Sequence, residues 1–240
     1  MQEPTGKVSA KDIKVRPIEK KYADKIIRRI HYSGKTVSNS QLNFGVFLEG
    51  KLLGAMQYGP PTRKDLIIGL VSDTDWNGFF ELNRLAFHDD LPRFSESRAI
   101  SLSFKWMKKN AKHIKWVISF ADGCQCGHGT IYQASNFKLT QIKENDQLVM
   151  LPDGTVTHKL SLRPELNKQM GIDGYTGITK WLDEMRPGWK MIKGYMLKYI
   201  YFLDKKVEKN FTGEYIPFSK IKEMGIGMYR GKSLSEYSGV

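Results

Sequence analysis

The stretch WVISFADGCQCGHGTIYQASNF, residues 116 to 137, decides the fold. It begins with a short, continuous apolar run of the kind found in strands that are buried on both faces. Glycines then open a turn, and TIYQASNF follows as a short helix. The stretch therefore predicts a strand, a turn and a helix, with polar side chains placed where the strand ends.

The segments before this stretch alternate between strand and helix patterns. IKVRPI (13 to 18) is expected to be a strand, and EKKYADKIIRRIHY (19 to 32) an amphipathic helix, because its apolar residues recur at helical spacing. FGVFLEGKLLGAMQYG (44 to 59) is typical of a hairpin, and FFELNRLAF (79 to 87) of a further strand. RAISLSFKWMKKNAKH (98 to 113) is expected to be a helix. Two strand-to-helix crossovers therefore follow one another.

Beyond the deciding stretch, DQLVMLPDGTVTHKLSL (146 to 162) predicts two strands that flank a Pro-Asp-Gly turn. The residues from 186 onward hold 11 Lys and Arg against 5 Asp and Glu. Within this tail, KGYMLKYIYFLDKK interleaves aromatic residues with lysines, so it either lies along DNA or is an ordinary strand packed on the core. We expect a core over residues 1–163 and a basic C-terminal extension over 164–240.

Charge and composition narrow the classes of partner. The chain has 240 residues and a net charge of +13, which favours a polyanion such as nucleic acid, although a basic protein often has only solvated lysine faces. No stretch approaches the roughly 18 apolar residues of a membrane span, and the first residues show no secretion signal. A cytoplasmic protein with reduced thiols is expected.

Polar residues near the predicted helix starts indicate an anion site. Ser95 or Ser97 is expected to cap the helix that follows the strand 79–87, and Arg93 and Arg98 would add charge. This arrangement suits the pyrophosphate of a cofactor, although it is also typical of a simple helix N-cap. The glycine-rich arginine loop that is common in proteins that use acetyl-coenzyme A is missing, so the identity of the cofactor stays open.

The deciding stretch also carries candidate acid–base chemistry. Asp122 ends the strand and Tyr132 lies on the short helix, so one could accept a proton and the other return it. The alternative is that Asp122 forms a turn and Tyr132 is a packed aromatic residue. Ser119 and Asn136 lie beside them and are expected to contact the donor.

Two further positions stand out upstream. His31, with Tyr32, follows an apolar-faced helix and is either a general base or a cation at the helix C-terminus. Arg84 lies inside a strand and requires a partner, for which Glu81 or Asp122 is available.

The cysteines do not predict a metal site. Cys124, Cys126 and His128 fall within five residues, which is not the spacing of a structural zinc site, and no second pair completes the ligand set. We expect no bound metal.

The order of elements resembles the GNAT acyltransferase fold, an α+β fold with a mixed sheet flanked by helices. The sequence motifs IHYSG, ELNRLAF, RFSES, SFADG and GTIYQASNF together resemble those of the Mom proteins of Mu-like phages. The resemblance runs from about Ile30 to Leu162. That resemblance implies an enzyme that converts adenine N6 in double-stranded DNA to a methylcarbamoyl-type derivative and so shields phage DNA from restriction in the cytoplasm of the host. It also implies an acyl or carbamoyl donor, with acetyl-coenzyme A as one possibility.

The resemblance assigns functional positions residue by residue. The matching words contain the following positions: His31, Tyr32, Arg84, Ser97, Ser119, Asp122 and Tyr132. The target adenine is paired in duplex DNA, so base flipping is expected, with Tyr32, Tyr58 or Trp76 stacked on the extruded base. Two alternatives remain: an acyltransferase that acts on a protein or small-molecule amine, and a DNA-binding protein without catalytic activity.

Overall fold

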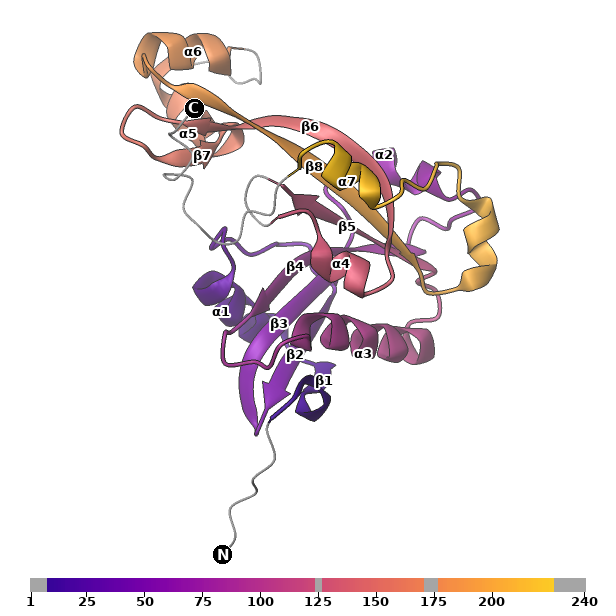
Figure 1. Cartoon of the computed structure of the whole chain (residues 1–240). Helices are drawn as coiled ribbons and strands as arrows, with labels where there is room; N and C mark the ends of the chain where they lie inside the picture. Colours follow the sequence, from indigo (N-terminus) through magenta and orange to yellow (C-terminus); the bar gives the residue numbers. More distant parts are fainter. Residues whose placement is uncertain (1–7, 124–126, 171–176, 227–240) are drawn as a thin grey trace, which may run out of the picture. The chain divides into compact units, whose positions relative to one another are not determined.

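The computed structural model describes residues 8–123, 127–170 and 177–226 (Figure 1). The strands in these ranges are β1 (Lys14–Pro17), β2 (Leu42–Leu48), β3 (Lys51–Gly59), β4 (Phe79–Phe87), β5 (Trp116–Asp122), β6 (Lys138–Met150), β7 (Val156–His158) and β8 (Lys190–Phe202). The helices are α1 (Lys20–Ile30), α2 (Lys64–Ile67), α3 (Ser95–Asn110), α4 (Thr130–Ala134), α5 (Lys159–Met170), α6 (Ile178–Met185) and α7 (Ser219–Glu223). Three short 3-10 helices are η1 (Ala10–Asp12), η2 (Ile68–Leu70) and η3 (Lys205–Asn210).

The strands follow the order β1-β2-β3-β4-β5-β8-β6-β7. The first four pair antiparallel in sequence order, whereas β4 and β5 run parallel, as a crossover through α3 requires. A mixed sheet with helices between its strands confirms the predicted α+β class and the element order of the GNAT-like fold.

The chain divides into two compact units, each formed by several segments. The first unit comprises residues 1–120, 130–140 and 198–217, and the second comprises 121–129, 141–197 and 218–240. The strands β5, β6 and β8 each contribute residues to both units. This division by contacts follows different boundaries from the predicted division at residue 163, which stays a prediction.

Helix α1 covers one face of the sheet in the first unit. Its buried residues Ala23 and Ile27 pack on Ala55 of β3 and Ala86 of β4. The small alanine side chains on the two strands let the helix approach the sheet closely. The C-terminal end of α1 is thereby fixed beside β4.

Helix α3 packs on the other side of β3. Its Ser103 hydroxyl lies 2.7 Å from the Tyr58 hydroxyl, and both side chains are fully buried. Phe104, one residue further along α3, stacks on Tyr201 of β8 with ring centroids 4.3 Å apart. Aromatic rings therefore fill the layer between α3 and the sheet.

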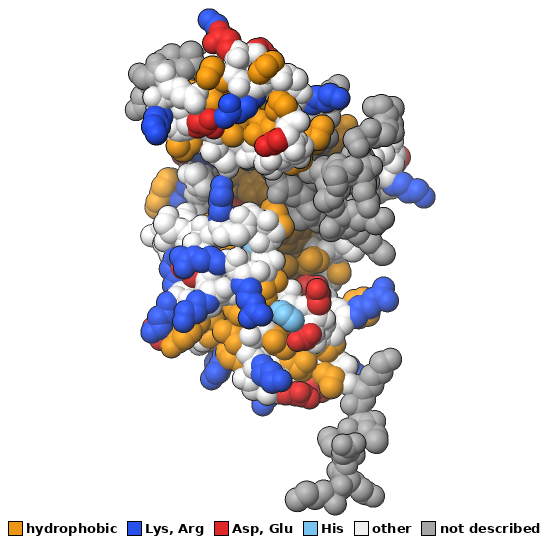
Figure 2. Space-filling model, turned by 90° about the vertical axis from the view of Figure 1, so that its left-hand side faces the viewer, with side chains coloured by type: hydrophobic (Ala, Val, Ile, Leu, Met, Phe, Trp, Pro, Cys, Tyr) orange, Lys and Arg blue, Asp and Glu red, His pale blue; other side chains and the backbone are white. Residues whose placement is uncertain are grey.

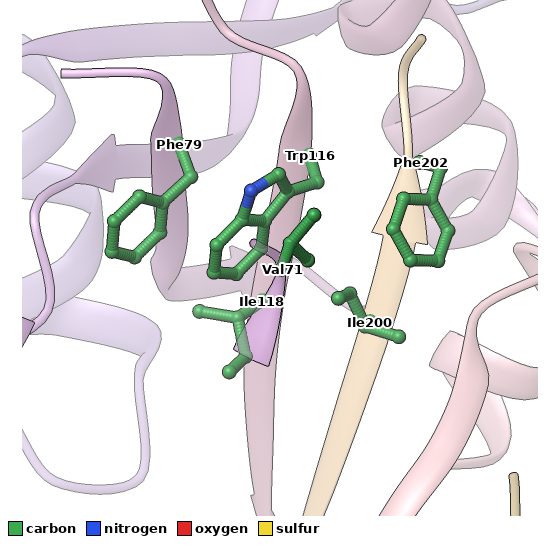
Figure 3. Close-up of a cluster of buried hydrophobic side chains, with 6 residues drawn as sticks. All are labelled: Val71, Phe79, Trp116, Ile118, Ile200 and Phe202. Atoms are coloured by element: carbon green, nitrogen blue, oxygen red, sulfur yellow. The ribbon is translucent and has the colours of Figure 1, made fainter. Parts of the chain in front are cut away.

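A second core cluster joins β4, β5 and β8 within the first unit (Figure 3). The rings of Phe79 and Trp116 stack with centroids 4.1 Å apart, and Trp116 Nε1 donates a hydrogen bond to Thr74 Oγ1 at 3.0 Å. Ile200 and Phe202 of β8 complete the cluster. Burying such side chains stabilises the fold by about 1.5–3 kcal/mol each.

The basic, aromatic part of the tail is a core strand. Tyr199 is fully buried in β8, and the half-buried Tyr201 is stacked on Phe104, so both rings pack on the core. Of the two readings left open for this segment, the structure supports the packed strand. The Gly- and Ser-rich residues 227–240 lie outside the described ranges.

The structure of the second unit differs from the hairpin predicted after residue 146. Strand β6 starts much earlier, at Lys138, and β7 has only three residues. The segment that begins at Lys159 is helix α5 rather than the end of a strand. Its Leu162 and Leu166, one helical turn apart, pack on Trp181 of α6, so the helical period prevails there.

Candidate active site

An irregularity in β4 brings polar side chains together at the centre of the sheet. Arg84 pairs with Gln57 of β3 and Leu82 pairs with Tyr58, which leaves Asn83 as an extra residue in a β-bulge. On the other side of β4, parallel pairing with β5 covers only Phe79 to Glu81. Bulges of this kind re-aim side chains and are frequent next to active sites.

Arg84 is held by backbone carbonyls on two sides. Its Nε donates to the Lys35 carbonyl at 2.9 Å, and its Nη1 donates to the Asn83 carbonyl at 2.7 Å. The bond to Lys35 ties the loop after α1 to β4. Arg84 therefore has a fixed guanidinium beside the end of α1.

His31 caps the C-terminus of α1 through its backbone N–H, which donates to the Ile27 carbonyl at 2.9 Å. Its Nδ1 accepts from the backbone N–H of Ser33 at 3.2 Å, so in the neutral ring the proton lies on Nε2. Burial and the nearby charge of Arg84 lower the pKa of His31 to about 4. The residue is a C-cap as expected, but it is neutral and not a cation at physiological pH.

Tyr32 and Tyr58 differ sharply in access to solvent. The Tyr32 ring lies 4.2 Å from the His31 ring and is 56% exposed. Tyr58 is fully buried on the α3 side, so the expectation that it stacks on a base is wrong. Trp76 is 58% exposed, with Lys64 Nζ 4.7 Å above its ring. Tyr32 is thus the exposed aromatic residue that adjoins His31.

Glu81 joins this cluster, and the sequence pattern pointed to it only as a partner for Arg84. Burial raises the pKa of Glu81 to about 7, against the opposing effects of a hydrogen bond from Asn83 and the charge of Arg84. Asn83 Oδ1 is itself buried without a hydrogen-bond partner among the described residues. The signal available in the sequence was a carboxylate flanked by Phe80 and Leu82 within a strand.

Ser119 and Tyr132 occupy different surroundings. Ser119 is fully buried, and its Oγ donates to the Leu82 carbonyl at 3.3 Å, which ties β5 to β4. The Tyr132 ring packs against Phe137 and Tyr199, with centroids 5.4 and 5.2 Å apart. The ring contacts of Tyr132 fit its packed alternative, and the catalytic role of Tyr132 and the donor-binding role of Ser119 stay predictions.

Asp122 ends β5 within the second unit. Its Oδ1 accepts from Asn145 Nδ2 at 3.4 Å, and Gly123 directly after it donates to the Tyr195 carbonyl at 2.7 Å. The proposed partnership of Asp122 with Arg84 or Tyr132 stays a prediction.

The predicted anion site at the start of α3 has a different cap from the one expected. The N-cap is Phe94, in the left-handed region with φ 72°, and its side chain makes no capping hydrogen bond. Ser95 is the first helical residue, and its buried Oγ has no hydrogen-bond partner among the described residues. Ser97 Oγ donates back to the Phe94 carbonyl at 3.3 Å, and the Arg93 guanidinium lies 5.0 Å from the Phe94 ring.

A pocket of about 380 Å³ lies between η1, α3 and the end of α4. Its polar lining comes from these side chains: Lys11, Ser97, Arg98, Ser101, Ser135 and Asn136. Ser97 and Asn136 of the predicted donor site therefore face one cavity, together with two cations. Arg93, Ser95 and Ser119 are not among its lining residues.

Cys124 and Cys126 lie outside the described ranges. The described residues contain no group of three His, Cys, Asp or Glu side chains that could hold a metal ion. None of the helices within those ranges is long and apolar enough to cross a bilayer.

Comparisons with solved structures retrieve GNAT acetyltransferases. A probable acetyltransferase from Staphylococcus epidermidis is 8% identical with a TM-score of 0.45, covering 79% of this chain and 98% of that one. The ribosomal-protein-S18-alanine N-acetyltransferase from Escherichia coli is 11% identical with a TM-score of 0.44, covering 80% and 94%. Scores this low do not decide a fold, which rests here on the strand order and the parallel β4–β5 pair.

Sequence comparison is far more specific. The chain is 35% identical over 204 residues to the methylcarbamoylase Mom of Escherichia phage Mu, which covers 85% of this chain and 80% of that protein. The model of the Mom protein family matches residues 12–220, a range that includes α1, the β4 bulge and α3. With a match of this extent, the chain belongs to the Mom protein family.

Proposed function

We propose that this protein is a transferase that converts adenine N6 in double-stranded DNA to a methylcarbamoyl-type derivative, and so protects phage DNA from restriction in the host cytoplasm. The observation that carries the proposal is the cluster of Glu81, Arg84 and His31 beside the exposed Tyr32, in a chain of the Mom family. The net charge of +13 suits a DNA substrate.

Transfer to an amine requires a base. When adenine N6 forms a bond to the transferred group, the bond between that group and its carrier breaks, the carrier leaves, and N6 loses one proton to a base. A base works best when its pKa is near the working pH. Glu81, with a pKa raised to about 7, fits this role better than His31, whose pKa is lowered to about 4. His31 instead offers its Nε2–H as a hydrogen-bond donor.

Arg84 supplies the fixed positive charge of the cluster. Its two backbone contacts hold the guanidinium in place before any substrate binds. A cation fixed in this way stabilises negative charge that develops on the transferred group, without the cost of reorganisation at the moment of reaction.

Access to a paired adenine requires base flipping. Extrusion of a base costs a few kcal/mol, and aromatic stacking on the extruded base offsets part of that cost. Tyr32 is suited to this task because its ring is 56% exposed and lies 4.2 Å from the His31 ring. The base would then lie beside the groups that act on it.

The pocket beside α3 fits an anionic donor. Lys11 and Arg98 provide two cations, and Ser97 and Asn136 provide neutral polar groups. A phosphate-bearing group such as that of coenzyme A would be held by these four side chains, on the α3 side of the sheet.

The proposal is tested by expressing the protein in bacteria and analysing nucleosides from digested DNA by mass spectrometry. We expect a mass-shifted deoxyadenosine with the wild type, greatly reduced in Glu81→Gln and retained in Glu49→Gln, a substitution in the β2–β3 turn. Plasmid from the same cells should resist restriction enzymes that have adenine in their sites.

Each other outcome favours one alternative. Unmodified deoxyadenosine with salt-dependent DNA binding would indicate a DNA-binding protein without this chemistry. Unmodified DNA with a new acyl group on a protein or small-molecule amine would indicate a different acceptor.

A further inference from the structure

Helix α1 exposes a row of cations on its solvent side. Ala23 and Ile27 face the sheet, whereas four basic residues on the remaining surface are exposed, and we call them the α1 cationic stripe: Lys21, Lys25, Arg28 and Arg29. Lys25 and Arg28, three residues apart, share one side of the helix, and the helix ends at Ile30, two residues before Tyr32. The stripe therefore leads to Tyr32.

Most of this charge is not neutralised by the residues that the structure describes. Asp24, the only acidic residue of α1, already binds Lys20 Nζ at 2.6 Å and accepts from Gln57 at 2.8 Å. Lys21 pairs with Glu19 at 2.8 Å, in a largely exposed ion pair. Lys25, Arg28 and Arg29 make no ion pair with any carboxylate of the described residues.

Favourable interaction with the helix dipole of α1 explains the position of only some of these cations. Arg28 and Arg29 lie in the last turn, where cations interact favourably with the helix dipole. Lys25 lies one turn earlier, where that effect has largely decayed. Figure 2, which views the side on which α1 lies in Figure 1, shows Lys and Arg side chains gathered at the level of that helix.

The dimensions match a DNA backbone. Lys25 and Arg29 lie four positions apart on α1, a rise of about 6 Å along the helix. Duplex DNA rises about 3.4 Å per base pair on each strand, so the segment from Lys25 to Arg29 matches roughly two steps along one strand.

We propose that Lys25, Arg28 and Arg29 bind the phosphates of duplex DNA next to the target adenine and hold that nucleotide at Tyr32 and the β4 cluster. This inference rests on the proposed function, because it assumes DNA as the substrate. Phosphate contacts position a protein without reading sequence. The stripe therefore sets affinity and register for every sequence context alike.

The experiment compares two triple variants with equal loss of charge. Lys25→Gln, Arg28→Gln and Arg29→Gln remove the proposed contacts. Lys105→Gln, Lys109→Gln and Lys112→Gln remove three exposed lysines in and just after α3, on the other side of the sheet. Both proteins are assayed for duplex DNA binding at several salt concentrations and for modification of plasmid DNA.

For the stripe variant we expect DNA affinity to fall about tenfold or more, and the slope of log K against log salt to decrease by about two to three. The KM for DNA should rise with little change in kcat, because these contacts act before the chemical step. The loss should be the same for adenines in different sequence contexts. The control variant should stay within about twofold of the wild type, and Lys25→Arg with Arg28→Lys and Arg29→Lys should restore most binding.

Equal losses in the two triple variants would overturn the proposal, because only net charge would then matter. A stripe variant with wild-type salt slope would also overturn it. If the wild type itself leaves DNA unmodified, the proposed function fails instead, and the salt slopes still report whether the stripe binds DNA. Circular dichroism melting of each variant distinguishes lost contacts from lost folding.

Discussion

Arg84 and His31 lie close enough for the guanidinium charge to act on the imidazole, and this charge adds to burial in lowering the pKa of His31 to about 4. The same guanidinium opposes the rise in the pKa of Glu81. Burial is the larger cause of both shifts, and Arg84 adds to it at His31 and opposes it at Glu81. The protonation states of the cluster therefore depend on burial first and on Arg84 second.

Replacing Arg84 with Gln should raise the pKa of His31 from about 4 towards its ordinary value, because one of the two causes of the shift is removed. Burial remains, so the return should be incomplete. NMR titration of the histidine ring protons measures this directly, with the His31 signal assigned through a His31→Gln variant. The signals of the other four histidines serve as internal controls. An unchanged His31 titration would contradict the electrostatic link.

Activity should increase with pH through about 7, because Glu81 must be ionised to accept a proton and its pKa is raised to about 7. The rate of adenine modification measured between pH 5.5 and 8.5 should follow a single titration and level off above pH 8. In Glu81→Gln the rate should be low and should not increase with pH through about 7. A wild-type profile with its midpoint near the ordinary glutamate pKa would argue against Glu81 as the base.

Stability should change in the opposite direction over the same range. The folded-state pKa of Glu81 lies above its unfolded value of 4.5, so the folded protein binds more protons between about pH 4.5 and 7 and loses stability as pH rises through that window. The rise in the pKa of Glu81 from 4.5 to about 7 corresponds to a loss of roughly 3 kcal/mol in the free energy of unfolding, as an upper bound. Glu81→Gln should therefore unfold at higher urea than the wild type at pH 8, with little difference at pH 4.5.

The periodicity of the sequence predicted the first unit well, and particular residues show why. Strand β4 has the predicted bounds, Phe79 to Phe87, because an apolar run there is bounded by turn residues on both sides. Helix α1 follows the helical spacing of its isoleucines. Where one face is buried and the other exposed, the apolar pattern alone specifies the element.

The β4 bulge and the switch at Lys159 could not be predicted this way. Which residue of Leu82, Asn83 and Arg84 leaves the ladder depends on pairing with β3, which is not local information. The sequence after His158 is compatible with a strand, and only the packing of Leu166 on Trp181 favours the helix. Likewise, the role of Glu81 depends on burial, and the sequence showed only a charge within a strand.

The buried pair of Tyr58 and Ser103 should respond unequally to substitution. Ser103→Ala leaves the fully buried Tyr58 hydroxyl with only the Met56 Sδ contact at 3.9 Å, and should cost about 1–3 kcal/mol. Tyr58→Phe should cost less, because Ser103 Oγ still donates to the Ile100 carbonyl at 2.8 Å. Urea unfolding of both variants measures the difference, and equal costs would contradict this account.

The pocket beside α3 should bind coenzyme A through its cations. We expect coenzyme A to raise the melting temperature of the wild type, and Arg98→Gln and Lys11→Gln each to weaken this effect severalfold. Lys112→Gln, outside the pocket, is the matched control. The absence of any shift at millimolar coenzyme A would exclude this carrier as the donor and leave the pocket for another anion.

Tyr32 should be required to hold the extruded base. Duplex DNA with 2-aminopurine at the target position fluoresces more strongly when that base leaves the stack, so it reports flipping before any chemistry. We expect the wild type and Tyr32→Phe to raise the fluorescence alike, because the ring provides the stacking and its hydroxyl is not needed for it. Tyr32→Ala should lose most of the signal, equivalent to about 1–3 kcal/mol of stacking. Trp76→Ala tests the other exposed ring: a loss there with an intact signal in Tyr32→Ala would reassign the stacking surface to α2 and the loop that follows it.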